Sequence, residues 1–94
     1  MDTEQLGRLL RRLKRALEQL ESEFARHHVD RALLVDIDRM VDDGLAAEPR
    51  TQHLVSGLER LRENTLTPRP ELYTDGIRDC RRMKALIEEV MGEL

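Results

Sequence analysis

Residues 3–28, TEQLGRLLRRLKRALEQLESEFARHH, decide the fold of this chain. Apolar side chains recur there at alternating spacings of four and three residues, which places them on one face of an α-helix. The members of this stripe are Leu6, Leu10, Leu13, Leu17, Leu20 and Phe24. As one helix the stretch would be about 39 Å long, longer than any later segment. The stripe needs packing partners along its whole length, so it predicts a helical assembly built on one long helix.

The composition of the 94 residues narrows the class of protein. Charged residues make up 37% of the chain with both signs interspersed, and the net charge of −3 gives no overall attraction to nucleic acid or membrane. A single cysteine excludes an internal disulfide framework and fits a reducing cytosol. With no Trp, one Phe and one Tyr, the chain lacks stacking platforms for flat cofactors. We expect a soluble cytoplasmic protein with one domain over residues 1–94, without cofactor, secretory signal or membrane span.

A turn is predicted at residues 28–30, directly after the apolar stripe. Asp30 is a suitable helix N-cap, and Val29 and Leu34 have the spacing of a hydrophobic staple around it. Neither Gly nor Pro occurs in this turn, so one uninterrupted helix to residue 43 stays as the alternative.

Two short helices are predicted after the turn. The first covers residues 31–43 and ends at Gly44, where we expect the left-handed backbone typical of helix C-termini, with Leu45 packing back on the last turn. The second begins with Pro49 at its first position and fades at Asn64.

A second long helix is predicted near the end of the sequence. It follows a proline-containing loop at residues 67–70 and begins either at Pro70 or after a Thr74 cap. No segment of useful length alternates apolar and polar residues with period two, so no strand is expected. The predicted fold class is all-α, a small antiparallel bundle of about four helices, two long and two short, with the first helix packed on the last.

Two clusters of like charge lie at electrostatically unfavourable ends of their helices. The first half of the first helix carries Arg8, Arg11, Arg12, Lys14 and Arg15, and the C-terminal part of the second helix carries Asp36, Asp38, Asp42 and Asp43. An antiparallel turn would bring these two ends level, so we expect the clusters to neutralise each other and to specify the antiparallel register. The alternative is an anionic partner, of which nucleic acid is the obvious form.

Candidate metal-binding and catalytic groups are sparse. Glu23 and His27 have the spacing of two metal ligands on one helix face, but a third ligand would have to come from His53, Cys80 or a partner chain. His28 points about 100° away from His27 on a helix, so the two histidines cannot easily share one ion. Cys80 lies on the apolar stripe of the last helix and is predicted to be a core residue. We predict no metal site and no catalytic residue.

The predicted function is non-catalytic. We expect a small cytoplasmic adaptor, regulator or assembly factor that binds another protein, or itself as a homo-oligomer, through a helical face left uncovered by the short helices. The candidate partner-binding residues are Leu6, Leu9, Leu10, Leu13, Arg8, Arg11, Arg12 and Arg15. The alternatives are a DNA-binding transcriptional regulator that uses the basic flank of the first helix, and a small all-α enzyme or metal-binding protein.

Overall fold

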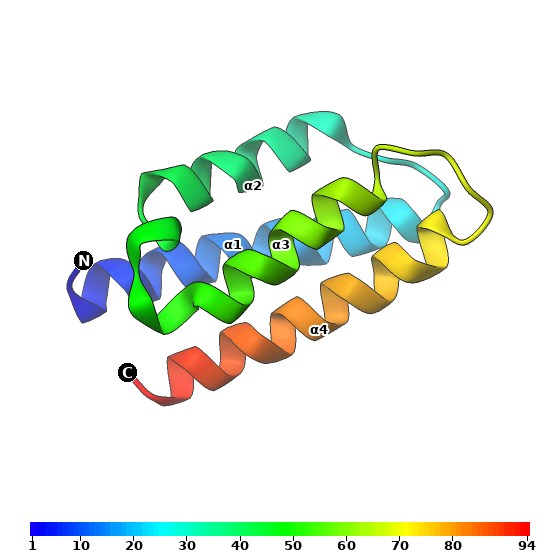
Figure 1. The fold of residues 1–94 in the computed structure, drawn as a ribbon. Helices are drawn as coiled ribbons and strands as arrows, with labels where there is room; N and C mark the ends of the chain where they lie inside the picture. Colours follow the sequence, from blue (N-terminus) through cyan, green and yellow to red (C-terminus); the bar gives the residue numbers. More distant parts are fainter.

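The computed structural model describes all residues 1–94 and has no strand. Its elements are α1 (Thr3–Ala25), α2 (Arg31–Asp43), the 3-10 turns η1 (Leu45–Ala47) and η2 (Pro49–Thr51), α3 (Gln52–Asn64) and α4 (Leu72–Gly92). α1 and α3 both pack along α4, and α2 lies along the side of α1 that is farther from α4 (Figure 1). The all-α bundle of two long and two short helices is confirmed, and so is the pairing of the first helix with the last.

The N-terminus of α1 is closed by a capping box. The Asp2 carboxylate accepts a hydrogen bond from the backbone N–H of Gln5 at 2.8 Å, and the Gln5 side chain accepts one from the backbone N–H of Asp2 at 3.3 Å. Two otherwise free donors at the helix start are thereby satisfied. Asp2 is therefore the N-cap of α1.

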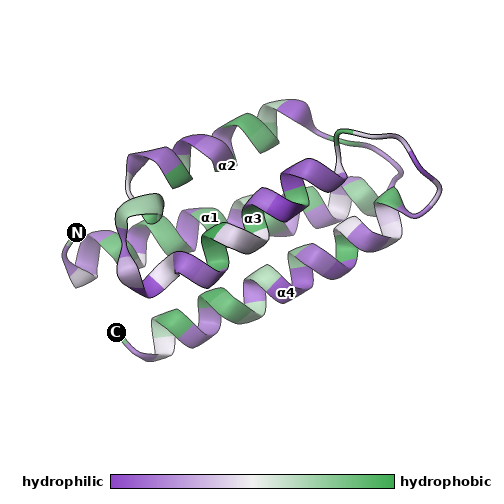
Figure 2. Ribbon diagram, in the orientation of Figure 1, coloured by the Kyte–Doolittle hydropathy of each residue, from purple (hydrophilic) through white to green (hydrophobic).

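The apolar stripe of α1 is completely covered within one molecule. All six stripe residues are 0% exposed, and side chains from all four α-helices and η1 join them in one cluster. Hydrophobic and hydrophilic segments alternate along every helix, as amphipathic helices require (Figure 2). The expectation of an uncovered part of the stripe is wrong, because α4 runs beside α1 and covers what the short helices do not reach.

α1 ends in a Schellman motif that contains no glycine. The backbone N–H of His27 donates to the carbonyl of Phe24, and that of His28 donates to the carbonyl of Glu23, both at 2.9 Å. His27 takes the left-handed conformation, with φ at 57°, and its ring stacks on Tyr73 at a centroid distance of 4.8 Å. The break therefore begins at residue 26, slightly before its predicted position, and the alternative of one uninterrupted helix is wrong.

The sequence predicted the N-cap of α2 correctly, but not the backbone conformation at its C-terminal end. Asp30 is the N-cap as expected, and its carboxylate accepts a hydrogen bond from the backbone N–H of Leu33 at 3.0 Å. Gly44 does not adopt the left-handed conformation, since its φ of 173° is extended. The chain leaves α2 in this extended form and enters η1 at once, which buries Leu45 completely in the core.

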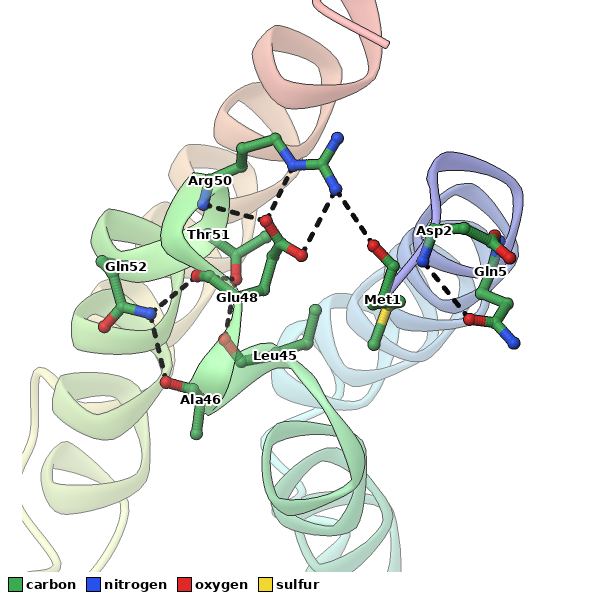
Figure 3. A network of polar contacts seen from close by, with 9 residues as sticks. All are labelled: Met1, Asp2, Gln5, Leu45, Ala46, Glu48, Arg50, Thr51 and Gln52. Atoms are coloured by element: carbon green, nitrogen blue, oxygen red, sulfur yellow. Dashed lines mark hydrogen bonds and ion pairs between the residues drawn. The ribbon is translucent and has the colours of Figure 1, made fainter.

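The connection between α2 and α3 is held by polar contacts (Figure 3). The Thr51 hydroxyl donates to the carbonyl of Leu45 at 2.8 Å, and the Gln52 side chain donates to the carbonyl of Glu48 at 2.7 Å. Pro49 begins η2, and α3 itself begins three residues later, at Gln52. The predicted start of this helix at Pro49 is therefore three residues too early. The predicted end of this helix at Asn64 is confirmed.

α4 begins at Leu72, between the two predicted starts at Pro70 and Thr74. A turn leads into it, in which the backbone N–H of Leu72 donates to the carbonyl of Arg69 at 3.1 Å. The Arg69 guanidinium pairs with the Asp75 carboxylate at 2.8 Å and ties this turn to the first turn of the helix. Thr74, the predicted cap, lies inside the helix, and Glu71 at the N-cap position makes no side-chain cap hydrogen bond.

Close packing fixes the start of α4 against the end of α1. A Cβ atom at Gly76 would lie 2.6 Å from Cε2 of Phe24, so the phenyl ring fills the space that any larger residue would need. The ring of Phe24 also lies 6.4 Å from that of Tyr73, centroid to centroid. None of the helices combines the length and the apolar content that crossing a membrane requires.

Candidate interaction surface on α1

Four arginines form what we call the arginine face of α1. Its members are Arg8, Arg11, Arg12 and Arg15, and all are exposed. Arg8 lies 3.8 Å from the Glu4 carboxylate, and both side chains are mostly in solvent. The other three arginines make no ion pair and no side-chain hydrogen bond within 4.0 Å. Three of the four positive charges on this face therefore have no ion-pair partner.

The expected ion pairs between these arginines and the aspartates of α2 do not form, although Asp43 lines the same hollow as Arg8 and Arg12. α2 does fold back antiparallel, but no ion pair joins any of its aspartates to α1. Asp38 lies 3.3 Å from Arg62 of α3, and Asp36 lies 3.9 Å from Arg39 of α2 itself. Asp42 and Asp43 are exposed and unpaired. The ends of the two helices are therefore level, as expected, and an open space lies between Asp43 and the two arginines Arg8 and Arg12.

We call this open space, where the start of α1 meets the end of α2 and η1, the α1–α2 groove. It consists of two hollows of about 320 and 360 Å³ that share Gln5 and Asp43 in their walls. Leu9 contributes the apolar part of the larger hollow, beside Arg8 and Arg12. The groove therefore runs alongside the arginine face and adds an apolar contact to it.

The structure divides the predicted partner-binding residues into two groups. Leu6, Leu10 and Leu13 are 0% exposed, so they belong to the core and present no surface to a partner. Leu9 is half-buried and reaches the groove, and the four arginines lie on the outside. The assignment of these three leucines, Leu6, Leu10 and Leu13, to binding is wrong, because the predicted pairing of the first helix with the last already covers them.

The two histidines near the end of α1 make contacts that stabilise the turn after this helix. The His28 Nδ1 atom lies 2.7 Å from a Glu23 carboxylate oxygen, and His27 stacks on Tyr73. No group of three or more His, Cys, Asp or Glu side chains is arranged to hold a metal ion. The third ligands considered from the sequence, His53 and Cys80, lie on α3 and in the core.

Cys80 is a core residue, as predicted. Its side chain is 0% exposed, and burial, with smaller effects from Glu21 and Asp79, raises the pKa of its thiol to about 12. A thiol that stays protonated at neutral pH is a poor nucleophile. Cys80 therefore has no place in a catalytic site.

Comparison with protein families, curated proteins and solved structures found no match. Function is therefore inferred from the residues of this chain.

Proposed function

We propose that this protein is a non-catalytic adaptor that binds an acidic segment of another protein on the arginine face of α1. The observation that carries the proposal is the lack of any ionic partner for Arg11, Arg12 and Arg15. These side chains lie on one face of α1 within little more than one turn of each other, so their positive charges repel. An anionic partner would remove the repulsion between them.

The α1–α2 groove supports the same proposal. A partner segment lying on the arginine face would also contact Leu9 in the groove. One apolar side chain of the partner would then be buried against Leu9, next to the partner's carboxylates. Interfaces of this kind combine a few desolvated apolar contacts with arginine pairs. Arginine also binds carboxylates with two parallel hydrogen bonds, which adds geometric specificity.

A narrow acidic peptide fits this surface better than duplex DNA. Asp43 lines the groove, and Asp42, its neighbour in the sequence, is exposed. A duplex carries phosphates over a broad surface and would bring some of them against these carboxylates. A single peptide segment can follow α1 alone and avoid the repulsion.

A second copy of this chain fits the arginine face less well than another protein. On α2, Asp38 and Asp36 already pair with Arg62 and Arg39. The exposed helical carboxylates that form no ion pair are spread over all four helices: Glu18, Asp42, Asp43, Glu59, Glu63 and Glu89. Because these carboxylates are dispersed, we propose that the acidic segment belongs to a different protein.

The test is the binding of a labelled peptide with alternating blocks of glutamate and leucine, followed by fluorescence anisotropy. We expect the variant Arg11→Gln/Arg15→Gln to bind about tenfold more weakly, a change of about 1.4 kcal/mol. The matched control Arg26→Gln/Arg39→Gln carries the same change in net charge away from the arginine face and should bind like the native protein. Binding should also weaken from about 50 to about 200 mM salt.

The same titration distinguishes the other partners. Tighter binding of a duplex DNA than of the peptide would replace the proposal with the DNA-binding alternative. A concentration-dependent increase in mass in light scattering, abolished in Arg11→Gln/Arg15→Gln, would show that the partner is a second copy. Equal binding by the two arginine variants would overturn the role of the arginine face altogether.

A further inference from the structure

Two buried carboxylates in this molecule have different surroundings. Glu48 and Asp79 are each 6% exposed. Glu48 accepts hydrogen bonds from the Arg50 guanidinium at 2.7 and 3.3 Å and from the Arg50 backbone N–H at 3.3 Å (Figure 3). These bonds hold the pKa of Glu48 below its usual value. Asp79 has one polar partner, the neutral amide of Asn64 at 3.3 Å, and no ion pair.

A buried carboxylate without a cation is unfavourable unless other groups compensate its charge. Asp79 lies in the wall of a hollow of about 280 Å³ between α3 and α4. Arg60 and Arg82 line the same hollow, yet neither pairs with Asp79 or with any other side chain. An unpaired acid and two unpaired bases therefore face one space.

The sequence builds this hollow from two rows of helical positions. On α3 the row contains His53, Ser56, Gly57 and Arg60, and on α4 it contains Asp79, Arg82, Met83 and Leu86. Residues at these spacings share one face of a helix. Gly57 has no side chain, and the Met83 thioether occupies the place where its Cβ would be. Met83 and Leu86 thus give the hollow an apolar part, and the polar side chains surround it.

Four side-chain donors in the hollow have no partner in the molecule. They are Arg60, Arg82, His53 and Ser56, which make no side-chain hydrogen bond or ion pair. Arginine pairs bind oxyanions through several N–H groups at once. A carboxylate ligand has two oxygen atoms to accept hydrogen bonds from these four donors. A phosphate group has three exposed oxygen atoms and therefore matches the four donors better. Asp79 adds an acceptor at the end of the hollow.

We propose that the α3–α4 hollow binds a small phosphomonoester with a hydroxylated carbon chain. Its phosphate oxygens accept hydrogen bonds from Arg60 and Arg82, with His53 and Ser56 beside them. A hydroxyl group of the ligand donates to Asp79, and its carbon atoms lie against Met83 and Leu86. This site is separate from the arginine face, because none of its residues belongs to α1.

The test uses glycerol 3-phosphate, inorganic phosphate and glycerol as probes, followed by NMR of the backbone amides. We expect saturable shifts of the α3 and α4 signals with glycerol 3-phosphate, weaker binding of phosphate, and none of glycerol. Arg60→Gln and Arg82→Gln should each weaken binding by fivefold or more. Both side chains are exposed and unpaired, so these variants keep the fold. Arg78→Gln, an exposed arginine on α4 outside the hollow, is the matched control and should bind normally.

Asp79→Asn tests the second half of the proposal. We expect it to reduce the preference for glycerol 3-phosphate over inorganic phosphate, because the ligand hydroxyl loses its charged acceptor. An unchanged preference would overturn the role of Asp79. An absence of saturable shifts with either phosphate compound, or equal binding by Arg60→Gln, Arg82→Gln and Arg78→Gln, would overturn the site.

Discussion

The side of α1 that faces α4 is joined by ion pairs and close packing, whereas the side that faces α2 is bordered by open hollows. Towards α4, Lys14 pairs with Glu88, and Glu21 lies 2.8 Å from Lys84 and 3.3 Å from Arg81. Towards α2, apolar side chains meet, but no ion pair crosses.

The two sides of α1 therefore have different roles in the molecule. The α1–α4 side combines a covered apolar stripe with charges matched across the two helices, so it specifies which helices pair and in which register. On the α2 side the like charges of each helix stay exposed, and the polar groups remain available to a partner. Elements held by fewer contacts open at lower free energy, so α2 should open before the α1–α4 pair does.

The largest expected effect comes from truncating one isoleucine on each side. Ile87 of α4 is 0% exposed and Ile37 of α2 is 3% exposed. We expect Ile87→Ala to lower the free energy of unfolding by roughly 4 kcal/mol and Ile37→Ala by roughly 2 kcal/mol, because the loosely held α2 can move to fill the cavity. Urea denaturation measures both losses, provided that the m-value of each variant equals that of the native protein. Equal losses would contradict the contrast between the two sides.

The next largest change in the free energy of unfolding is expected at Gly76, which packs against the ring of Phe24. Gly76→Ala places a methyl group 2.6 Å from the ring, so we expect a loss of about 1–3 kcal/mol although alanine favours helix. Gly7→Ala is the control, because the nearest atom to its Cβ is an Arg11 nitrogen at 3.6 Å. There the helix preference of alanine should add about 0.5–1 kcal/mol. The two alanine variants should therefore shift the melting temperature in opposite directions, and shifts of the same sign would disprove the close contact at Phe24.

The smallest expected effect is the acid dependence of the α1–α4 ion pairs. Burial tends to raise the pKa of Glu21, but Lys84 and Arg81 outweigh it, so the pKa is lower in the folded state. The ion pairs therefore stabilise the fold above the ordinary pKa of 4.5 and are lost as pH falls through the folded-state value. We expect Glu21→Gln to remove up to about 1 kcal/mol of this acid-dependent stability. Asp36→Asn, at an exposed ion pair within α2, is the control, and an equal effect of both variants would refute the contrast.

The sequence predicted the fold well where short-range patterns decide it. The stripe of α1, the Asp30 cap and the limits of α2 follow from spacing and capping chemistry alone. The Schellman motif at His27 was not predicted, because a histidine there lacks the signal that glycine gives. Its stabilising contact with Tyr73 comes from the other end of the chain.

The polar surface was predicted less well for a physical reason. Exposed charges have several possible partners of similar energy, so Asp38 pairs with Arg62 where α1 was expected. Asp79 stands beside Cys80 in the sequence, and nothing local distinguishes it from an exposed acid. The repeated helical spacing from His53 to Arg60 and from Asp79 to Leu86 is a usable signal, but it becomes meaningful only when the two rows are known to face each other.

The pairing of the first helix with the last has a consequence for biosynthesis. Lys14 and Glu88 meet across a separation of 74 residues. At roughly 5–20 residues per second, α4 is made about 4–15 s after the matching part of α1. During that interval the leucines of α1 lack their principal cover, so the nascent chain presents an apolar helix to chaperones and to neighbouring chains. Of the four helices, the longest is therefore made before the other three and is among the last to be buried.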